Sequence, residues 1–196
     1  MMKSRHLIDV ILMFGMVLLT ASFTGCAPLN QTNDDKTPGM DTDPIIALLT
    51  PDIERLYLSW HELNQTYKDI KFLERGFLFD PDDRQLAYIQ KAGLYVQDAA
   101  VRIHHRWEQL SVIHYIRPEM MRDYLTLNVK GLTSAVKEIE YDEKFLTIYG
   151  SFITHETVTN ELNLAREGIE KNMGVLNQIL DRLRPIANKT TPPTVL

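Results

Sequence analysis

Apolar residues recur at alternating steps of three and four along this chain, and this spacing constrains the fold more than any other feature. Such steps place side chains on one face of an α-helix, whereas a strand requires a period of two. The clearest example is the row Leu86, Ile89, Gly93, Val96, Ala100, Ile103, Trp107 and Leu110. We therefore expect an all-α protein.

Three other stretches carry the same spacing. One runs from Ile53 to Ile70, one from Leu125 to Leu146, and one from Val158 to Leu183. Each row is a heptad seam of the kind that buries one helix against another. The chain therefore predicts four helices that share one core.

Prolines divide these stretches from one another. Pro51, Pro81 and Pro118 each suit the first position of a helix, where the missing N–H is harmless, and Pro185 follows the last row. If the three links between the rows all turn, the result is an up-down four-helix bundle with both ends on one side. If the chain only kinks at Arg117-Pro118 or at Gly150, the alternative is an elongated helical hairpin or coiled coil.

The N-terminal residues have the pattern of a secretory signal. Lys3 and Arg5 precede an apolar stretch from Val10 to Phe23, which leads to Phe23-Thr24-Gly25-Cys26. A charged start, an apolar middle and small residues before a cut are typical of such leaders. The apolar stretch is shorter than the roughly 20 residues that a membrane-spanning helix needs.

Phe23-Thr24-Gly25-Cys26 resembles the lipobox of bacterial lipoproteins. The resemblance implies removal of residues 1–25 and attachment of acyl chains to Cys26, the one cysteine of the chain. Ala27 stands where enterobacterial lipoproteins of the inner membrane have Asp. By that resemblance we expect attachment to the outer membrane, facing the periplasm.

These features predict four parts. A signal peptide occupies residues 1–25, a flexible tether with the lipidated cysteine occupies 26–50, the helical bundle occupies 51–184, and a disordered tail occupies 185–196. The tether and the tail are rich in proline and polar residues, which do not build a core. The short apolar run from Ile45 to Leu49 at the end of the tether is expected to be a docking segment or a helical turn ahead of the bundle.

Charge and motifs exclude several functions. The formal net charge of −5 argues against nucleic acid as a partner, because binding to phosphates depends on Lys and Arg. His104 and Glu108 lie four residues apart and could offer two metal ligands, but zinc or di-iron sites need three or four. The alternative is an exposed helical pair. No nucleophile elbow or glycine-rich phosphate loop is present. We expect no catalytic residue, no metal and no cofactor.

A few seam residues are candidates for close packing or for a partner-binding groove. Glycine and alanine in a seam permit close approach of helices or leave a groove, and a polar seam residue can fix the register of two helices. The candidates are Trp60, Gly93, Ala100, Trp107 and Asn172.

Three functions remain open from the sequence. The first is a lipid-tethered, non-catalytic helical module that binds or scaffolds an envelope protein. The second is a bundle that binds a hydrophobic small molecule or a metal between its helices, and the third is an enzyme with an unrecognised site. A cavity lined by Trp60, Tyr67 and Trp107 would favour the second, and a flat apolar groove would favour the first.

Overall fold

The computed structural model describes residues 42–77 and 83–189 of the chain. This part contains four long helices and no strand, so the all-α prediction is confirmed. The helices are α2 (Asp43–Phe77), α3 (Asp83–Ser111), α4 (Met121–Gly150) and α5 (Glu156–Lys189). The predicted leader, Cys26 and residues 190–196 lie outside the described residues.

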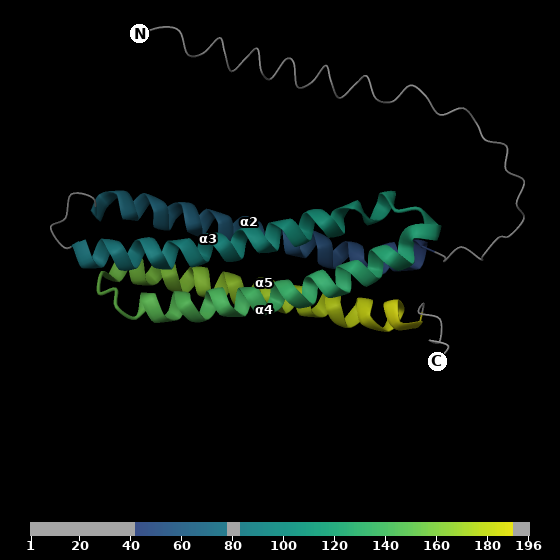
Figure 1. Ribbon diagram of the computed structural model, residues 1–196. Coiled ribbons are helices and arrows are strands. Elements are labelled where there is room, and N and C mark those ends of the chain that lie inside the picture. Colours follow the sequence, from purple (N-terminus) through teal and green to yellow (C-terminus); the bar gives the residue numbers. More distant parts are fainter. Residues whose placement is uncertain (1–41, 78–82, 190–196) are drawn as a thin grey trace, which may run out of the picture. The chain divides into compact units, whose positions relative to one another are not determined.

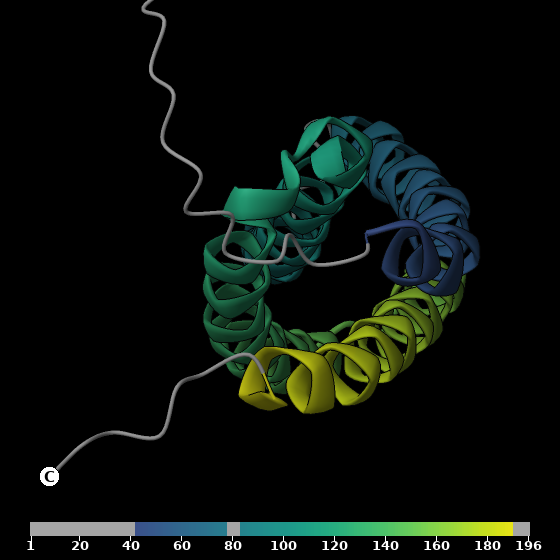
Figure 2. The same ribbon diagram turned by 90° about the vertical axis from the view of Figure 1, so that its right-hand side faces the viewer.

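The four helices run alternately up and down around a common axis (Figures 1 and 2). Each packs against its neighbours in chain order, and α5 closes the bundle by packing against α2. The beginning of α2 and the end of α5 lie at the same end of the bundle (Figure 1). The up-down four-helix bundle is therefore confirmed, and the elongated hairpin is wrong.

The link between α3 and α4 is a real turn. Two short 3₁₀ helices, η1 (Val112–Tyr115) and η2 (Pro118–Met120), are separated by Ile116 and Arg117, which are both extended, with ψ of 124° and 145°. Proline disfavours a helical conformation at the residue before it, which explains the break at this position. The Tyr124 hydroxyl donates to the carbonyls of Gln109 and Leu110 at 3.0 and 3.1 Å, and so caps the end of α3.

The other two links also separate helices. α4 ends at Gly150 and α5 begins at Glu156. Residues 78–82, which connect α2 to α3 and include Pro81, lie outside the described residues.

The predicted seams form the core. Most of their residues are fully buried, among them Leu56, Leu63, Ile89, Ile103, Leu132, Ile139, Ile169 and Ile179. Trp60, Tyr67 and Trp107 are only partly buried and lie at the edge of this core. The seams thus locate the core correctly, and the three largest rings in them mark its border.

Helix α2 begins eight residues earlier than predicted. Residues 43–50, which we expected to belong to the flexible tether, are helical, and Pro51 lies inside the helix. Ile45 and Leu49 are buried in the core. Burial of such side chains stabilises by about 1.5–3 kcal/mol each, which offsets the roughly 3 kcal/mol that an interior proline costs.

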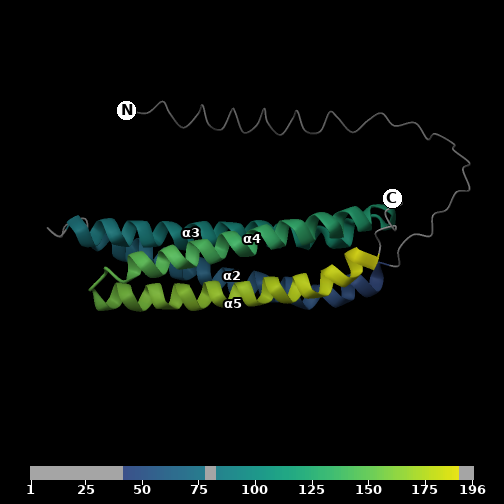
Figure 3. The same ribbon diagram turned by 60° about the horizontal axis from the view of Figure 1, so that its bottom comes forward.

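Side chains supply donors to the backbone just before Pro51 (Figure 3 shows α2 and α5 side by side here). The Thr50 hydroxyl donates to the Ile46 carbonyl at 2.8 Å, and the Arg182 guanidinium donates to the Leu48 carbonyl at 2.9 Å. The carbonyl that loses its N–H donor at Pro51 is that of Ala47, four residues earlier, so these two bonds support the carbonyls on either side of it.

Helix α5 likewise extends beyond its predicted end. It continues through Pro185 to Lys189, and Ala187 is buried. The predicted disordered tail is therefore wrong for residues 185–189. The remaining seven residues of that tail lie outside the described part of the chain.

Candidate functional site

Five aromatic side chains cluster on the surface where α2 and α3 meet, and we call them the aromatic patch: Tyr57, Trp60, His61, His104 and Trp107. Their rings overlap closely. The Trp60 ring lies 4.2 Å from that of His104 and 6.3 Å from that of Trp107, to which it is nearly parallel at 3°. Tyr57 contacts Trp107 at 4.8 Å between ring centroids.

Helical spacing explains why these rings meet. Tyr57, Trp60 and His61 are separated by three and four residues on α2, and His104 and Trp107 by three on α3. His61 is exposed, and the other four rings are partly buried. The patch is thus a partly exposed aromatic surface, in which indole and imidazole rings combine apolar area with polar nitrogens.

A shallow groove of about 170 Å³ adjoins the patch. Between two of its lining residues, the Tyr67 hydroxyl donates to the Gln97 amide oxygen at 2.9 Å. Its lining residues are Trp60, Asn64, Tyr67, Gln97, Ala100, Val101 and His104. Sites for drug-sized ligands usually occupy about 300–1,000 Å³, so this groove suits side chains of a partner better than an enclosed small molecule.

The histidines of this region pair with one carboxylate. His104 Nδ1 lies 3.9 Å from Glu108 Oε1, and His105 Nδ1 lies 3.8 Å from Glu108 Oε2. Within residues 42–77 and 83–189, no group of three or more His, Cys, Asp or Glu side chains could hold a metal ion. The His104–Glu108 spacing thus yields an exposed helical contact.

Three of the five predicted site residues come together here. Trp60 and Trp107 belong to the patch, and Ala100 lines the groove. Gly93 lies farther along the α2–α3 contact, where a Cβ would be 3.5 Å from Ile70, an ordinary packing distance. Asn172 lies elsewhere, between α5 and α2.

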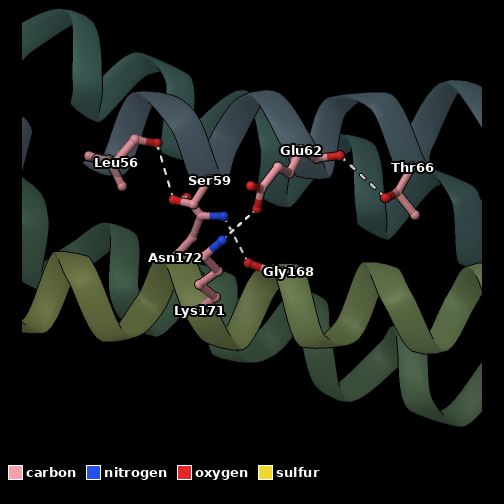
Figure 4. Close-up of polar contacts among 7 residues, drawn as sticks. All are labelled: Leu56, Ser59, Glu62, Thr66, Gly168, Lys171 and Asn172. Atoms are coloured by element: carbon pink, nitrogen blue, oxygen red, sulfur yellow. Dashed lines mark hydrogen bonds and ion pairs between the residues drawn. The ribbon is translucent and has the colours of Figure 1, made fainter. Parts of the chain in front are cut away.

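Asn172 is fully buried and bridges two helices (Figure 4). The Ser59 hydroxyl lies 2.8 Å from Asn172 Oδ1, and Asn172 Nδ2 donates to the Gly168 carbonyl at 2.8 Å. On the adjacent surface Lys171 pairs with Glu62. The Ser59–Asn172 and Glu62–Lys171 contacts join α2 to α5 and set the register of the two helices at this seam position.

Sequence reasoning missed several polar residues of the interior. Ser59, Asp52, Asn128 and Asp142 are all buried. Asp142 is held by Arg102, whose Nε lies 2.9 Å from Asp142 Oδ2, and Arg102 also pairs with Glu138. Burial raises the pKa of Asp142, and the hydrogen bond and charge of Arg102 oppose this rise without cancelling it.

Sequence reasoning also missed Tyr57, His61 and His104 as members of the aromatic patch. Their spacing from the two tryptophans was readable, but the pairing of α2 with α3 in this register was not. The signal that could have found them is their position next to the two tryptophans: Tyr57 and His61 lie within three residues of Trp60, and His104 lies three residues before Trp107.

Comparisons of the chain with protein-family models, with curated proteins and with solved structures found no match. Of the helices that the structure describes, none combines the length and the apolar character needed to cross a bilayer.

Proposed function

We propose that this chain is a lipid-anchored, non-catalytic helical module that binds another protein of the bacterial cell envelope. The aromatic patch carries the proposal. Partly exposed tryptophan and tyrosine side chains are enriched where proteins bind one another, because they combine a large contact area with few rotatable bonds. The patch brings three such side chains, Tyr57, Trp60 and Trp107, together with the rings of two histidines.

The leader supports the location in this proposal. Phe23-Thr24-Gly25-Cys26 resembles a lipobox, and Ala27 suits retention at the outer membrane with the bundle in the periplasm. Several acyl chains on Cys26 would hold the protein at the bilayer, where one chain alone binds weakly. A protein held at a membrane meets its partners by proximity as well as by affinity.

The alternative of a small-molecule or metal carrier receives less support. The groove beside the patch is shallow and includes Trp60 and Tyr67 but not Trp107 in its lining. Such a groove gives a hydrophobic ligand little enclosure, whereas a partner protein needs only a complementary surface.

Affinity capture from detergent-solubilised envelopes tests the proposal. The full chain should recover one envelope protein in stoichiometric amount, and His61→Glu should reduce its recovery at least fivefold, because the change places a charge on the patch. His61 is exposed, so the variant should keep its circular dichroism and its unfolding midpoint. Trp60→Gln provides a second variant with a larger loss of contact area.

Tyr115→Ser is the matched control. Among the described residues, Tyr115 is the most exposed of the large hydrophobic side chains, at 85%, and it belongs to η1 rather than to the patch. Recovery should be unchanged in this variant. Equal recovery by the wild type and by both patch variants would refute the proposal, as would a bound small molecule in native mass spectra without any stoichiometric protein.

A further inference from the structure

Helix α4 carries a row of large apolar side chains on its outer face. Met120, which directly precedes the helix, and Leu127, Tyr141 and Ile148 are 52%, 67%, 57% and 41% exposed. They follow a repeat of seven, and exposed Ser134 occupies the central position of the row. In Figure 2, α4 forms one corner of the bundle and its outer face has no neighbouring helix of the bundle.

A second row with the same repeat lies in the core. Leu125, Leu132, Ile139 and Leu146 are all buried, and they hold α4 in the bundle. The outer row therefore has no role in the core. It offers one apolar position per heptad, whereas the core seams offer two, and the lysines described below flank it. Four large apolar side chains that share one exposed helix face make this face a candidate interaction site.

Lysines follow the outer row on one flank. Lys130, Lys137 and Lys144 are exposed and also repeat every seven residues, after Asp123 at the start of the same flank. Within the described part of the chain, none of these lysines pairs with a carboxylate. A regular row of unpaired cations is unexpected in a chain whose net charge is −5.

We propose that the outer face of α4 docks a helix of another protein, one with an apolar heptad row flanked by acidic side chains. The apolar rows would pack together, and the acidic side chains would pair with Lys130, Lys137 and Lys144, as flanking charges do in coiled coils. From Met120 to Ile148 the row spans about 42 Å at ~1.5 Å per residue, so the partner helix needs about four heptads.

This inference rests on the proposed function, because it gives the chemistry of a protein partner. It concerns a different surface from the aromatic patch. The patch lies between α2 and α3, and the outer row lies on α4 alone, so the two surfaces can be tested separately.

Charge favours this occupant over a second copy of the chain. An antiparallel pair centred on Ser134 would bring Lys130 of one copy beside Lys137 of the other, which is repulsive. In a parallel pair, the lysines of one copy would face the opposite flank of α4 in the other copy. The carboxylates on that flank, Glu138 and Asp142, already pair with Arg102 of their own chain. A partner with free carboxylates meets neither difficulty.

Charge also disfavours an anionic bilayer as the occupant. Glu119, Asp123 and Glu140 are exposed on or beside the same helix, and the whole chain is acidic. A bilayer would not require a seven-residue register either, whereas a helix does.

Two synthetic four-heptad peptides test the proposal by fluorescence anisotropy with the detergent-solubilised full chain. Both have the same Leu and Ile at the seam positions, and the flanking positions hold Glu in one and Lys in the other. The acidic peptide should bind at least tenfold more tightly than the basic one. Its affinity should fall as salt is raised from 50 to 500 mM, because exposed charge pairs are screened.

Variants of the chain then locate the site. Lys130→Glu with Lys137→Glu should weaken the acidic peptide at least tenfold. The matched control, Lys68→Glu with Lys91→Glu, reverses two exposed lysines on α2 and α3 and should leave its affinity unchanged. Leu127→Ser with Tyr141→Ser should abolish binding with no change in circular dichroism, because both side chains lie on the surface.

Several results would overturn the proposal. Equal affinity for both peptides would do so, as would an equal loss in the control pair. Dimerisation in sedimentation that depends on Leu127 would assign the face to a second copy. Binding to phosphatidylglycerol–phosphatidylcholine vesicles that depends on Lys137 would assign it to a membrane. Any of these can occur while capture through His61 succeeds, so failure here does not decide the proposed function.

Discussion

Ser59 donates a hydrogen bond to Asn172 Oδ1 inside the apolar interface between α2 and α5. Ser59→Ala leaves the buried Asn172 Oδ1 without this donor. We expect a loss of about 1–2 kcal/mol in the free energy of unfolding, because an unsatisfied buried acceptor keeps its full desolvation cost. Urea denaturation of the full chain measures this loss.

Ser134→Ala is the control for this change, since Ser134 is exposed on α4 and bonds to Glu138 there. It should alter stability by less than about 0.5 kcal/mol. The double variant Ser59→Ala, Asn172→Leu should recover part of the loss, because both polar groups are then absent. Equal effects of Ser59→Ala and Ser134→Ala would contradict the role of the buried contact.

Asp142 predicts a pH dependence with a definite sign. Its pKa is raised in the folded protein, chiefly by burial. The folded state therefore binds a proton more tightly than the unfolded state does. The stabilisation from this group is fully present below the ordinary value of 3.8 and is lost as pH rises through the raised value.

Chemical denaturation at a series of pH values checks this dependence. The difference in stability between the wild type and Asp142→Asn should shift in favour of the wild type as pH falls toward 3.8. Glu140→Gln, an exposed change on the same helix, should show no such trend. A difference that is constant with pH would contradict the assignment.

At the scale of the helix, one ion pair ties the third turn of α2 to α5. Arg182 Nη1 lies 2.9 Å from Oδ2 of Asp52, which is fully buried. Neither oxygen of Asp52 accepts a well-oriented hydrogen bond from the described residues. The Arg182 guanidinium therefore supplies the closer of two positive charges at this buried carboxylate, the other being that of Arg55, whose Nη2 lies 3.8 Å from Oδ1.

Arg182→Met should destabilise the protein by about 2 kcal/mol, less than the roughly 3–5 kcal/mol of a fully buried pair because Arg182 is 39% exposed. Thermal unfolding measures the effect. Adding Asp52→Asn to Arg182→Met should restore part of the stability, because the carboxylate is then neutral. If Arg184→Met, which loses an exposed pair with Asp181, costs as much, the proposed role of Arg182 is wrong.

The sequence predicts helices better than it predicts their ends. Heptad spacing is a property of a single helix. The four rows and the residues that they bury could therefore be predicted without knowing how the helices pack together. The helix ends were missed because Pro51 and Pro185 were interpreted by local rules alone. Burial of Ile45, Leu49 and Ala187 outweighs the local cost, and this burial depends on the tertiary structure.

The candidate site was predictable in part for the same reason. Trp60, Ala100 and Trp107 occupy seam positions, so their helix faces were known. Whether they meet depends on how α2 is aligned with α3, and no single-helix pattern contains that information. Asn172 could be placed in a seam, but its partner Ser59 could not be chosen in advance.

For the whole molecule, the lipobox resemblance predicts where the protein is found in a cell. The wild-type chain should fractionate with membranes and carry acyl chains on Cys26. Cys26→Ser should release the protein into the soluble fraction with its thermal midpoint unchanged, because none of the four described helices contains residue 26. Mass spectrometry of the natural protein checks the modification, and an unmodified thiol would contradict it.

The described chain enters the bundle at Asp43 and leaves it at Lys189 on the same end (Figure 1). A force applied between these two points would separate α2 from α5 one turn at a time, beginning at this end of the bundle. It would not load all the contacts between the two helices at once. Trp60 lies about 25 Å from the start of α2, at ~1.5 Å per residue. We expect optical tweezers to record early, gradual yielding at low load, during which the aromatic surface keeps its shape.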